Sequence, residues 1–189
     1  NYAESPIVSL FWRERLIRAM RFFLQEHEER RSFVEDAQAE KEMQLVLGEG
    51  DAAIHIHGRA DRVEHWKDGS YCYIDFKSGS SIPSKAAVER GEAPQLPLYF
   101  MAGLQAEGRR AEAEAHFAYW RLPSGGNEGE TCDITMSAER IAELWQGYAD
   151  MVAYYLCRQN AFLYAPEGGK KPYLYDALAR AGEWGGAES

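Results

Sequence analysis

The chain has 189 residues, of which 46% are hydrophobic and 13% aromatic, enough apolar surface for one core and one domain. No apolar run approaches the roughly 18 to 20 residues that a membrane-spanning helix needs, and the N-terminus lacks the basic, apolar and small-residue order of a signal peptide. The formal net charge of −9 excludes a protein that coats nucleic acid by charge alone, so any DNA contact must be local.

The cysteines indicate the cellular setting. Cys72, Cys132 and Cys157 are too few and too scattered for a disulfide framework or a four-cysteine metal site. A reducing, cytoplasmic setting is the simplest inference. The chain begins at Asn1 rather than at a methionine, which is typical of a fragment of a longer protein, and we expect one domain over residues 1–189.

An N-terminal helix is predicted within residues 1–35. Ser5 is expected to be its N-cap and Pro6 its first residue, and apolar residues then recur at helical spacing as far as Leu24. The charged residues between them, up to Arg31, are interpreted as a solvated face with ion pairs rather than as a DNA-binding stripe.

A sheet core with one helix is predicted over residues 40–122. The β-rich runs predict strands at 43–47 and 53–57, then a hairpin whose polar turn is 67–70, and a last strand at 113–122. The helix is expected to begin near Pro94.

The C-terminal part is predicted to be a long helix over residues 137–163, capped by Ser137, and an irregular tail over 164–189. These elements together predict an α/β fold.

Two aspartates carry the chemistry of the predicted hairpin. Asp61 lies on its first strand and Asp75 on its second, and the strand period of two puts Asp75 and Lys77 on one face and Phe76 on the other. Hard cations such as Mg²⁺ prefer oxygen ligands, so Asp61, Asp75 and the backbone carbonyl of Phe76 are candidate metal ligands. Lys77 is a candidate for holding the attacking water or stabilising charge on a phosphate. The pattern predicts a metal-dependent phosphodiesterase site.

An acid on one strand followed by acid-x-lysine on the next resembles the PD-(D/E)XK nuclease superfamily. Residues 58–62, 74–79 and 93–99 look like three consecutive blocks of its RecB-like branch, and the third block and residues 175–184 are most similar to the C-terminal nuclease domain of bacterial AddB proteins. The resemblance covers most of the chain.

That resemblance implies a restriction-endonuclease-like core, with a mixed, mainly antiparallel sheet flanked by helices. It also implies Mg²⁺- or Mn²⁺-dependent, exonuclease-type cleavage of DNA. The implied setting is a helicase-nuclease that resects double-strand breaks for recombination repair, with an AddA-type subunit as partner.

The resemblance implies supporting residues as well. Gln95 and Tyr99 match the Gln-x-x-x-Tyr of the branch, and their spacing of four puts both on one helix face, where they support the lysine or contact the DNA backbone. Arg59 and Arg62, which flank the first aspartate, either pair with it or contact DNA. Glu40 is a candidate auxiliary metal ligand.

Two features of such relatives are missing from the sequence. A Gly-Thr-containing block with a histidine on the helix before the sheet does not occur, and His27 in its charged surroundings is a poor substitute. We therefore expect weak or no cleavage by this chain alone. The four cysteines that hold an iron-sulfur cluster in many AddB relatives are absent, so no cluster is expected.

Three other interpretations remain. The chain is a non-catalytic nuclease-like scaffold that guides DNA or docks a partner subunit, or a hydrolase of some other phosphate ester. The third interpretation is a zinc site, because His55, His57 and His65 lie near the acids. These histidines lack an obvious further ligand.

Overall fold

In the part of the chain that the structure describes, five strands form one mixed sheet, in the order β1-β2-β3-β4-β5. The computed structural model describes residues 6–50, 53–79, 81–109, 114–124 and 126–157. The strands are β1 (Val34–Leu47), β2 (Ile54–Trp66), β3 (Tyr71–Lys77), β4 (Ala115–Arg121) and β5 (Glu130–Met136). Only β3 and β4 run parallel; every other neighbouring pair is antiparallel. The predicted α/β fold with a mainly antiparallel mixed sheet is confirmed.

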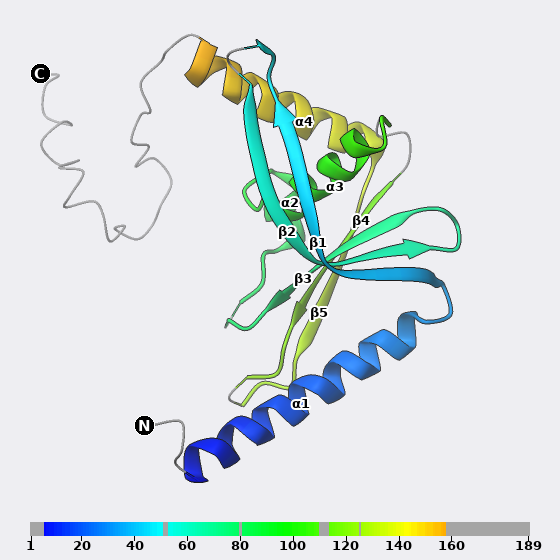
Figure 1. Cartoon of the computed structure of the whole chain (residues 1–189), viewed down its shortest axis with the longest axis vertical. Coiled ribbons are helices and arrows are strands. Elements are labelled where there is room, and N and C mark those ends of the chain that lie inside the picture. The colour runs from blue at the N-terminus through cyan, green and yellow to red at the C-terminus, as the bar shows by residue number, and fades with distance from the viewer. Residues whose placement is uncertain (1–5, 51–52, 80, 110–113, 125, 158–189) are drawn as a thin grey trace, which may run out of the picture.

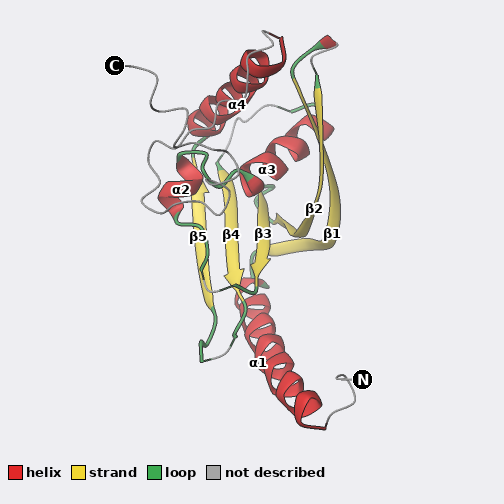
Figure 2. Cartoon of the chain, turned by 90° about the vertical axis from the view of Figure 1, so that its left-hand side faces the viewer, coloured by secondary structure: helices red, strands yellow, loops and turns green. Residues whose placement is uncertain are grey.

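Helices cover both faces of this sheet (Figures 1 and 2). They are α1 (Pro6–Arg30), α2 (Lys85–Glu89), α3 (Gln95–Ala106) and α4 (Ala138–Val152), which continues as a short π-helical turn, Ala153–Cys157. Helices α2 and α3 lie in the crossover between the parallel strands β3 and β4, and α1 lies apart from the other three helices in Figure 1. Among the described helices, none combines the length and the apolar character needed to cross a membrane.

The sheet has a separate apolar layer on each face. Leu96, Phe100 and Tyr73 belong to the larger cluster, beneath α3. Ile74 and Trp120, together with aromatic side chains of α1, belong to the smaller one. Because neighbouring residues of β3 enter opposite clusters, the strand has the alternation that the sequence predicts.

Sequence patterns locate most elements but misjudge the extent of some. Helix α1 and the cap of α4 are confirmed, since the Ser137 side chain accepts a hydrogen bond from the amide of Arg140. Strand β1 begins at Val34, well before the predicted residue 43, because its first half pairs along β2 with mostly exposed side chains and so has no apolar alternation. Strand β5 lies between the predicted strand 113–122 and the predicted helix from residue 137, and was not predicted. Ser5 and the predicted tail 164–189 lie outside the described residues.

The long ribbon of β1 and β2 bends sharply (Figures 1 and 2). Ile56 and Ala60 on β2 pack in the cluster beneath α3, whereas Arg62, of the same parity, turns toward α1 and contacts His27. The face of β2 therefore changes close to Asp61. On β1 the residue at the same level is Glu40, whose φ of 54° is left-handed, a conformation that non-glycine residues adopt rarely and at bends.

Candidate functional site

The hairpin of β2 and β3 brings both predicted aspartates to one face of the sheet. Arg62 pairs with Ile74, and the ladder ends there, so Asp75, Phe76 and Lys77 extend beyond the last residue of β3 that pairs with β2. The amide of Phe76 instead donates a 2.7 Å hydrogen bond to Oδ2 of Asp61. The Asp61 carboxylate thus accepts the hydrogen bond that a backbone carbonyl of β2 would otherwise accept, and this bond holds Asp61 beside Asp75.

Asp75 forms a closed cluster of three side chains with Gln95 and Lys77. Its Oδ1 accepts a 2.7 Å hydrogen bond from Nε2 of Gln95, and its Oδ2 lies 2.7 Å from Nζ of Lys77. Lys77 in turn donates to Oε1 of Gln95 at 3.1 Å. The first residue of α3 therefore fixes the orientation of both the acid and the lysine, and the amide orientation follows from having one neighbour that accepts and one that donates.

Burial makes the Asp75 carboxylate costly to ionise. Its side chain is only 5% exposed, and burial raises the pKa of Asp75, with a further increase from the Asp61 carboxylate; Lys77 and Gln95 lower that pKa without cancelling the increase. Lys77 forms an ion pair with Oδ2, which is buried and has no further partner among the described residues. A buried carboxylate oxygen with spare lone pairs is suited to a cation.

The oxygen donors around this position fit a hard divalent cation. Asp61 and Asp75 supply carboxylates, and the carbonyl of Phe76 points to the same strand edge as its amide, which bonds Asp61. The described residues contain no cluster of three or more His, Cys, Asp or Glu side chains. Two carboxylates and one carbonyl, completed by water, match the way proteins bind Mg²⁺.

The raised pKa gives a prediction for stability. A carboxyl whose pKa is higher in the folded state binds more protons there than in the unfolded chain, so unfolding free energy falls as the pH rises from the unfolded pKa through the folded one. Asp75→Asn has no carboxyl to ionise at this position. In EDTA, the unfolding free energy of Asp75→Asn minus that of wild type should therefore increase from pH 3 to neutral. Urea unfolding followed by circular dichroism at several pH values measures it. A variant that loses stability relative to wild type as the pH rises would contradict this assignment.

Tyr99 lies one turn of α3 after Gln95 and packs against Gly58 of β2. A Cβ at Gly58 would lie 2.7 Å from Cε1 of the Tyr99 ring, so only glycine leaves room for this ring. Tyr99 and Gln95 also line a cavity of about 170 Å³ with residues of β1 and β2. The first and third sequence blocks are thus in direct contact at the site.

The structure separates the other three predicted residues. Glu40 lies between Ala39 and Lys41, whose partners on β2 flank the first aspartate, but its carboxylate pairs at 2.7 Å with the exposed side chain of Arg59. Arg62 points to the opposite face, where it is nearly buried, donates to Glu64 at 2.9 Å and contacts His27. Arg59 and Glu40 therefore stay near the site's rim, and Arg62 does not join it.

Sequence reasoning missed the contribution of β4. The parallel register aligns Asp75 with Tyr119 and Lys77 with Arg121, so both β4 side chains lie on the face of the aspartates. The Tyr119 ring centroid is 5.8 Å from the ammonium of Lys77, and burial raises the pKa of its phenol. The alternation at 117, 119 and 121 was a usable signal, but only the parallel pairing with β3 shows which residues become neighbours.

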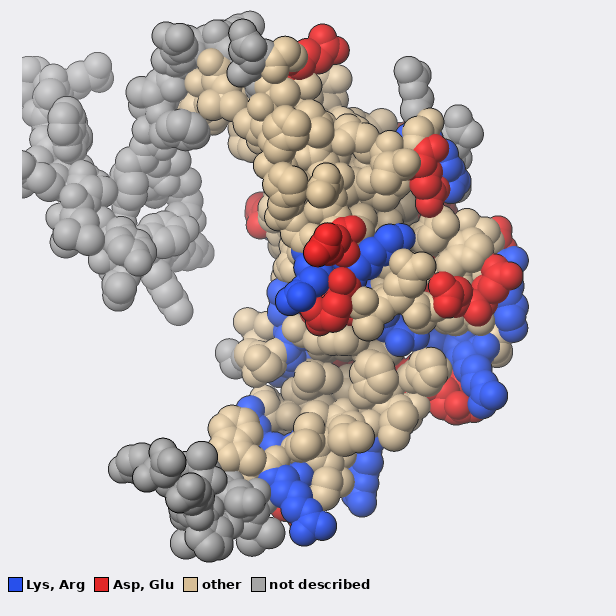
Figure 3. All heavy atoms as spheres, in the orientation of Figure 1, with Lys and Arg blue, Asp and Glu red and all other residues tan. Residues whose placement is uncertain are grey.

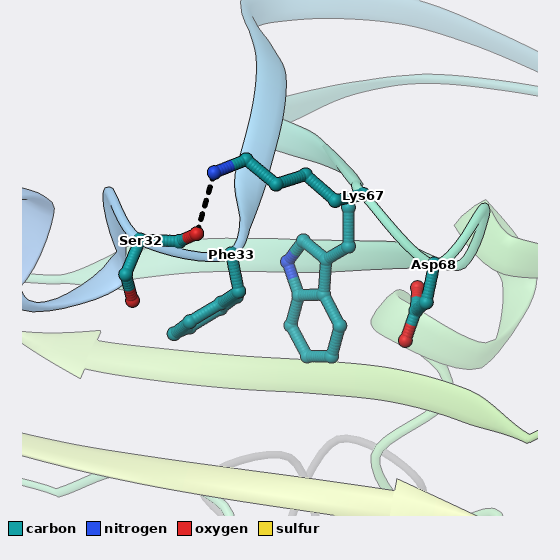
Figure 4. A pocket seen from close by; sticks show the side chains of 5 residues that line it. Ser32, Phe33, Lys67 and Asp68 are labelled. Carbon is teal, nitrogen blue, oxygen red and sulfur yellow. Dashed lines mark hydrogen bonds between the residues drawn. The ribbon is translucent and has the colours of Figure 1, made fainter.

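A larger hollow of about 520 Å³ lies at the other end of the hairpin (Figure 4). Phe33 and Trp66 line it, and Lys67 donates to the carbonyl of Ser32. Trp66 stacks on His116 at 4.6 Å between ring centroids and is part of the apolar cluster on the α1 face. This hollow is therefore not part of the carboxylate site.

The histidines near the acids do not gather around a metal. His65 pairs with Glu35 at 3.0 Å, whereas the exposed His55 and His57 belong to the outer part of β2. Among the described residues, none of the three lies in a group of metal-binding side chains, so the structure offers no support for zinc.

Comparison with known proteins finds a matching family, a related protein and a similar solved structure. The sequence profile of the PD-(D/E)XK nuclease superfamily matches residues 3–167. An uncharacterized protein of Rickettsia bellii (strain RML369-C) is 26% identical over 183 residues, which covers 87% of this chain but only 22% of that protein, so the chain spans about a fifth of this relative's length. The crystal structure of SSO0001 superposes with a TM-score of 0.40 at 15% identity, covering 85% of this chain and 68% of the other.

Proposed function

The chain belongs to the PD-(D/E)XK nuclease superfamily, and from this premise we propose that it is a metal-dependent DNA nuclease domain that hydrolyses phosphodiester bonds at the cluster of Asp61, Asp75, Lys77 and Gln95. One observation carries the proposal. Two carboxylates, a lysine and an amide from three elements converge on one point, with distances of 2.7 to 3.1 Å within the Asp75 cluster.

The proposed roles follow from these contacts. Asp61, Asp75 and the carbonyl of Phe76 would hold Mg²⁺ or Mn²⁺, which would polarise the phosphate and lower the pKa of the attacking water. Gln95 keeps Asp75 and Lys77 in place. Lys77, whose ammonium sits at the partly exposed edge of the cluster, holds the attacking water or the charge that develops on the phosphate.

The charge distribution supports a local DNA contact. On the face drawn in Figure 3, acidic and basic side chains are mixed over the middle of the protein, and Lys and Arg gather over the lower end, where α1 lies. A chain with a net charge of −9 therefore needs its substrate contacts close to the site or from a partner.

We further propose the setting that the three ordered sequence blocks suggest: an exonuclease-type domain of an AddB-type helicase-nuclease in double-strand-break repair, assembled with an AddA-type subunit in the cytoplasm. The length of the Rickettsia relative supports a domain of a longer protein. The rival is a nuclease-like scaffold without activity, favoured by the histidine block that the sequence lacks.

One experiment separates these functions. Cleavage of labelled single- and double-stranded DNA is measured in Mg²⁺, Mn²⁺ or EDTA for this chain and for a longer chain, each as wild type and as Asp75→Ala. We expect metal-dependent cleavage by the longer chain that Asp75→Ala removes, and weak or no cleavage by this chain alone. If the longer wild-type chain cleaves no DNA in either metal, the scaffold interpretation replaces the catalytic one.

A further inference from the structure

We propose that Arg121, at the end of β4, holds a phosphate of the nucleic-acid strand beside Lys77. The inference rests on the proposed function and adds a substrate-binding residue to it. Arg121 is aligned with Lys77 in the parallel pair and has the same parity as Tyr119, so both cations lie on the face of the aspartates. The amide of Leu122 donates to the carbonyl of Lys77 at 2.9 Å, which fixes the two strand ends together.

The position is one where open α/β sheets bind ligands. Both residues end their strands, and ligands of such sheets lie outside the carboxyl ends of parallel strands. Neighbouring strands are about 4.8 Å apart, so two cations in register on one face repel each other unless an anion lies near.

Acids of the protein now offset that repulsion. Lys77 has Asp75 at 2.7 Å, and Arg121 has Glu130 at 2.7 Å on the adjacent strand. If Asp75 serves as a metal ligand, its negative charge is shared between the metal ion and Lys77. The repulsion between Lys77 and Arg121 is then less well offset, which favours binding of another anion near them. A phosphate supplies it.

The two side chains of the Arg121–Glu130 pair differ in exposure, which suits replacement of Glu130 by a phosphate. The Arg121 side chain is 18% exposed, whereas the Glu130 side chain is 52% exposed. A guanidinium presents several N–H donors in a planar fork that matches two phosphate oxygens. A phosphate can therefore bind Arg121 while Glu130 turns to solvent.

The test measures binding rather than cleavage. Affinity for a labelled single-stranded oligonucleotide is determined over a range of salt concentrations, in EDTA and with Ca²⁺ as a cation for the aspartates, for wild type, Arg121→Gln and Arg121→Lys. We expect Arg121→Gln to weaken binding about tenfold, as for loss of a charged hydrogen bond. Its plot of log affinity against log salt should become shallower by about 0.7, the loss of one phosphate contact. Arg121→Lys should keep the slope and lose only part of the affinity.

A matched pair elsewhere provides the control. Arg109 and Glu107 also form an arginine–glutamate pair, at 2.9 Å, and Arg109→Gln should change neither the affinity nor the slope. Glu130→Gln should tighten binding two- to fivefold, and only when Arg121 is present; Glu107→Gln should not. Circular dichroism melts confirm that each variant is folded.

The outcomes are distinct from those of the cleavage experiment. Equal affinities and slopes for wild type and Arg121→Gln would overturn the inference even if the wild type cleaves DNA. The inference would also be overturned if Glu130→Gln still increased the oligonucleotide affinity when combined with Arg121→Gln. A general effect of the protein's charge would then explain the increase. Binding through Arg121, together with no metal-dependent cleavage by the longer chain, would uphold this inference and remove the proposed catalysis.

Discussion

Lys77→Met is expected to lower metal-dependent DNA cleavage by about a hundred- to thousandfold, the usual effect of removing one group that stabilises transition-state charge. Methionine keeps most of the aliphatic stem but removes the ammonium that contacts Asp75 and Gln95. The longer chain with demonstrated activity is the protein in which to measure the single-turnover rate.

Metal binding should survive this change and acquire a different pH dependence. Lys77 lowers the pKa of Asp75, so its loss raises that pKa further and moves the acidic limb of metal binding to higher pH. Calorimetric titration with Mn²⁺ at several pH values measures this. Lys85→Met, at an exposed position on α2, is the control and should leave both rate and pH limb unchanged. A Lys77→Met variant with the wild-type rate would remove Lys77 from the proposed mechanism.

The sequence predicted the hairpin and the placement of its polar side chains because local rules govern them. The turn at 67–70 and the strand period place Asp75, Lys77 and Phe76 as observed, and the spacing of Gln95 and Tyr99 places both on one side of α3. The family comparison confirms the superfamily, not its RecB-like branch or AddB type.

Contacts between elements that lie far apart in the chain could not be predicted from local sequence patterns. The pairing of β3 with β4 crosses some forty residues, so nothing near Arg121 indicated that it ends beside Lys77. The polarity of Arg30 and Arg62 likewise predicted solvated or DNA-facing side chains, whereas both are nearly buried against Glu64. Charged residues stay at the surface unless a partner is buried with them, and that partner lies far along the chain.

Glu64→Ala is expected to destabilise the fold by about 3–5 kcal/mol, the cost of leaving buried charges without their partner. The Glu64 side chain is fully buried. Its oxygens accept from Arg62 at 2.9 Å, from the indole of Trp66 at 3.1 Å and from Arg30 at 3.3 Å. Without it, Arg30 keeps only its pair with the exposed Asp133 among the acids of the described residues. In a chain of this size each kcal/mol lowers Tm by roughly 2–4 °C, so Tm should fall by about 6–20 °C.

A second glutamate on the same ribbon separates burial from pairing. Glu40 pairs with Arg59 at 2.7 Å, but both side chains are more than half exposed, so Glu40→Ala should cost at most about 1 kcal/mol. Replacing Arg30, Arg62 and Glu64 together by Met, Leu and Leu should restore much of the stability, because no buried charge then remains unpaired. Urea unfolding of these variants gives the comparison. Similar losses for Glu64→Ala and Glu40→Ala would show that burial of this cluster has little energetic weight.

The same cluster connects stability to the site. The ion pair of Arg30 with Glu64 joins the end of α1 to the sheet. Two turns earlier in α1, Phe23 packs edge-on against Phe76 at 5.8 Å between ring centroids. Phe76 is the residue whose amide holds Asp61 and whose carbonyl faces the proposed metal position. Loosening α1 in Glu64→Ala should therefore lower the temperature at which cleavage is lost, while the rate well below that temperature stays within about twofold of wild type, since no group in the Asp75 cluster has changed. A large loss of rate in a fully folded Glu64→Ala protein would mean instead that α1 sets the geometry of the carboxylates directly.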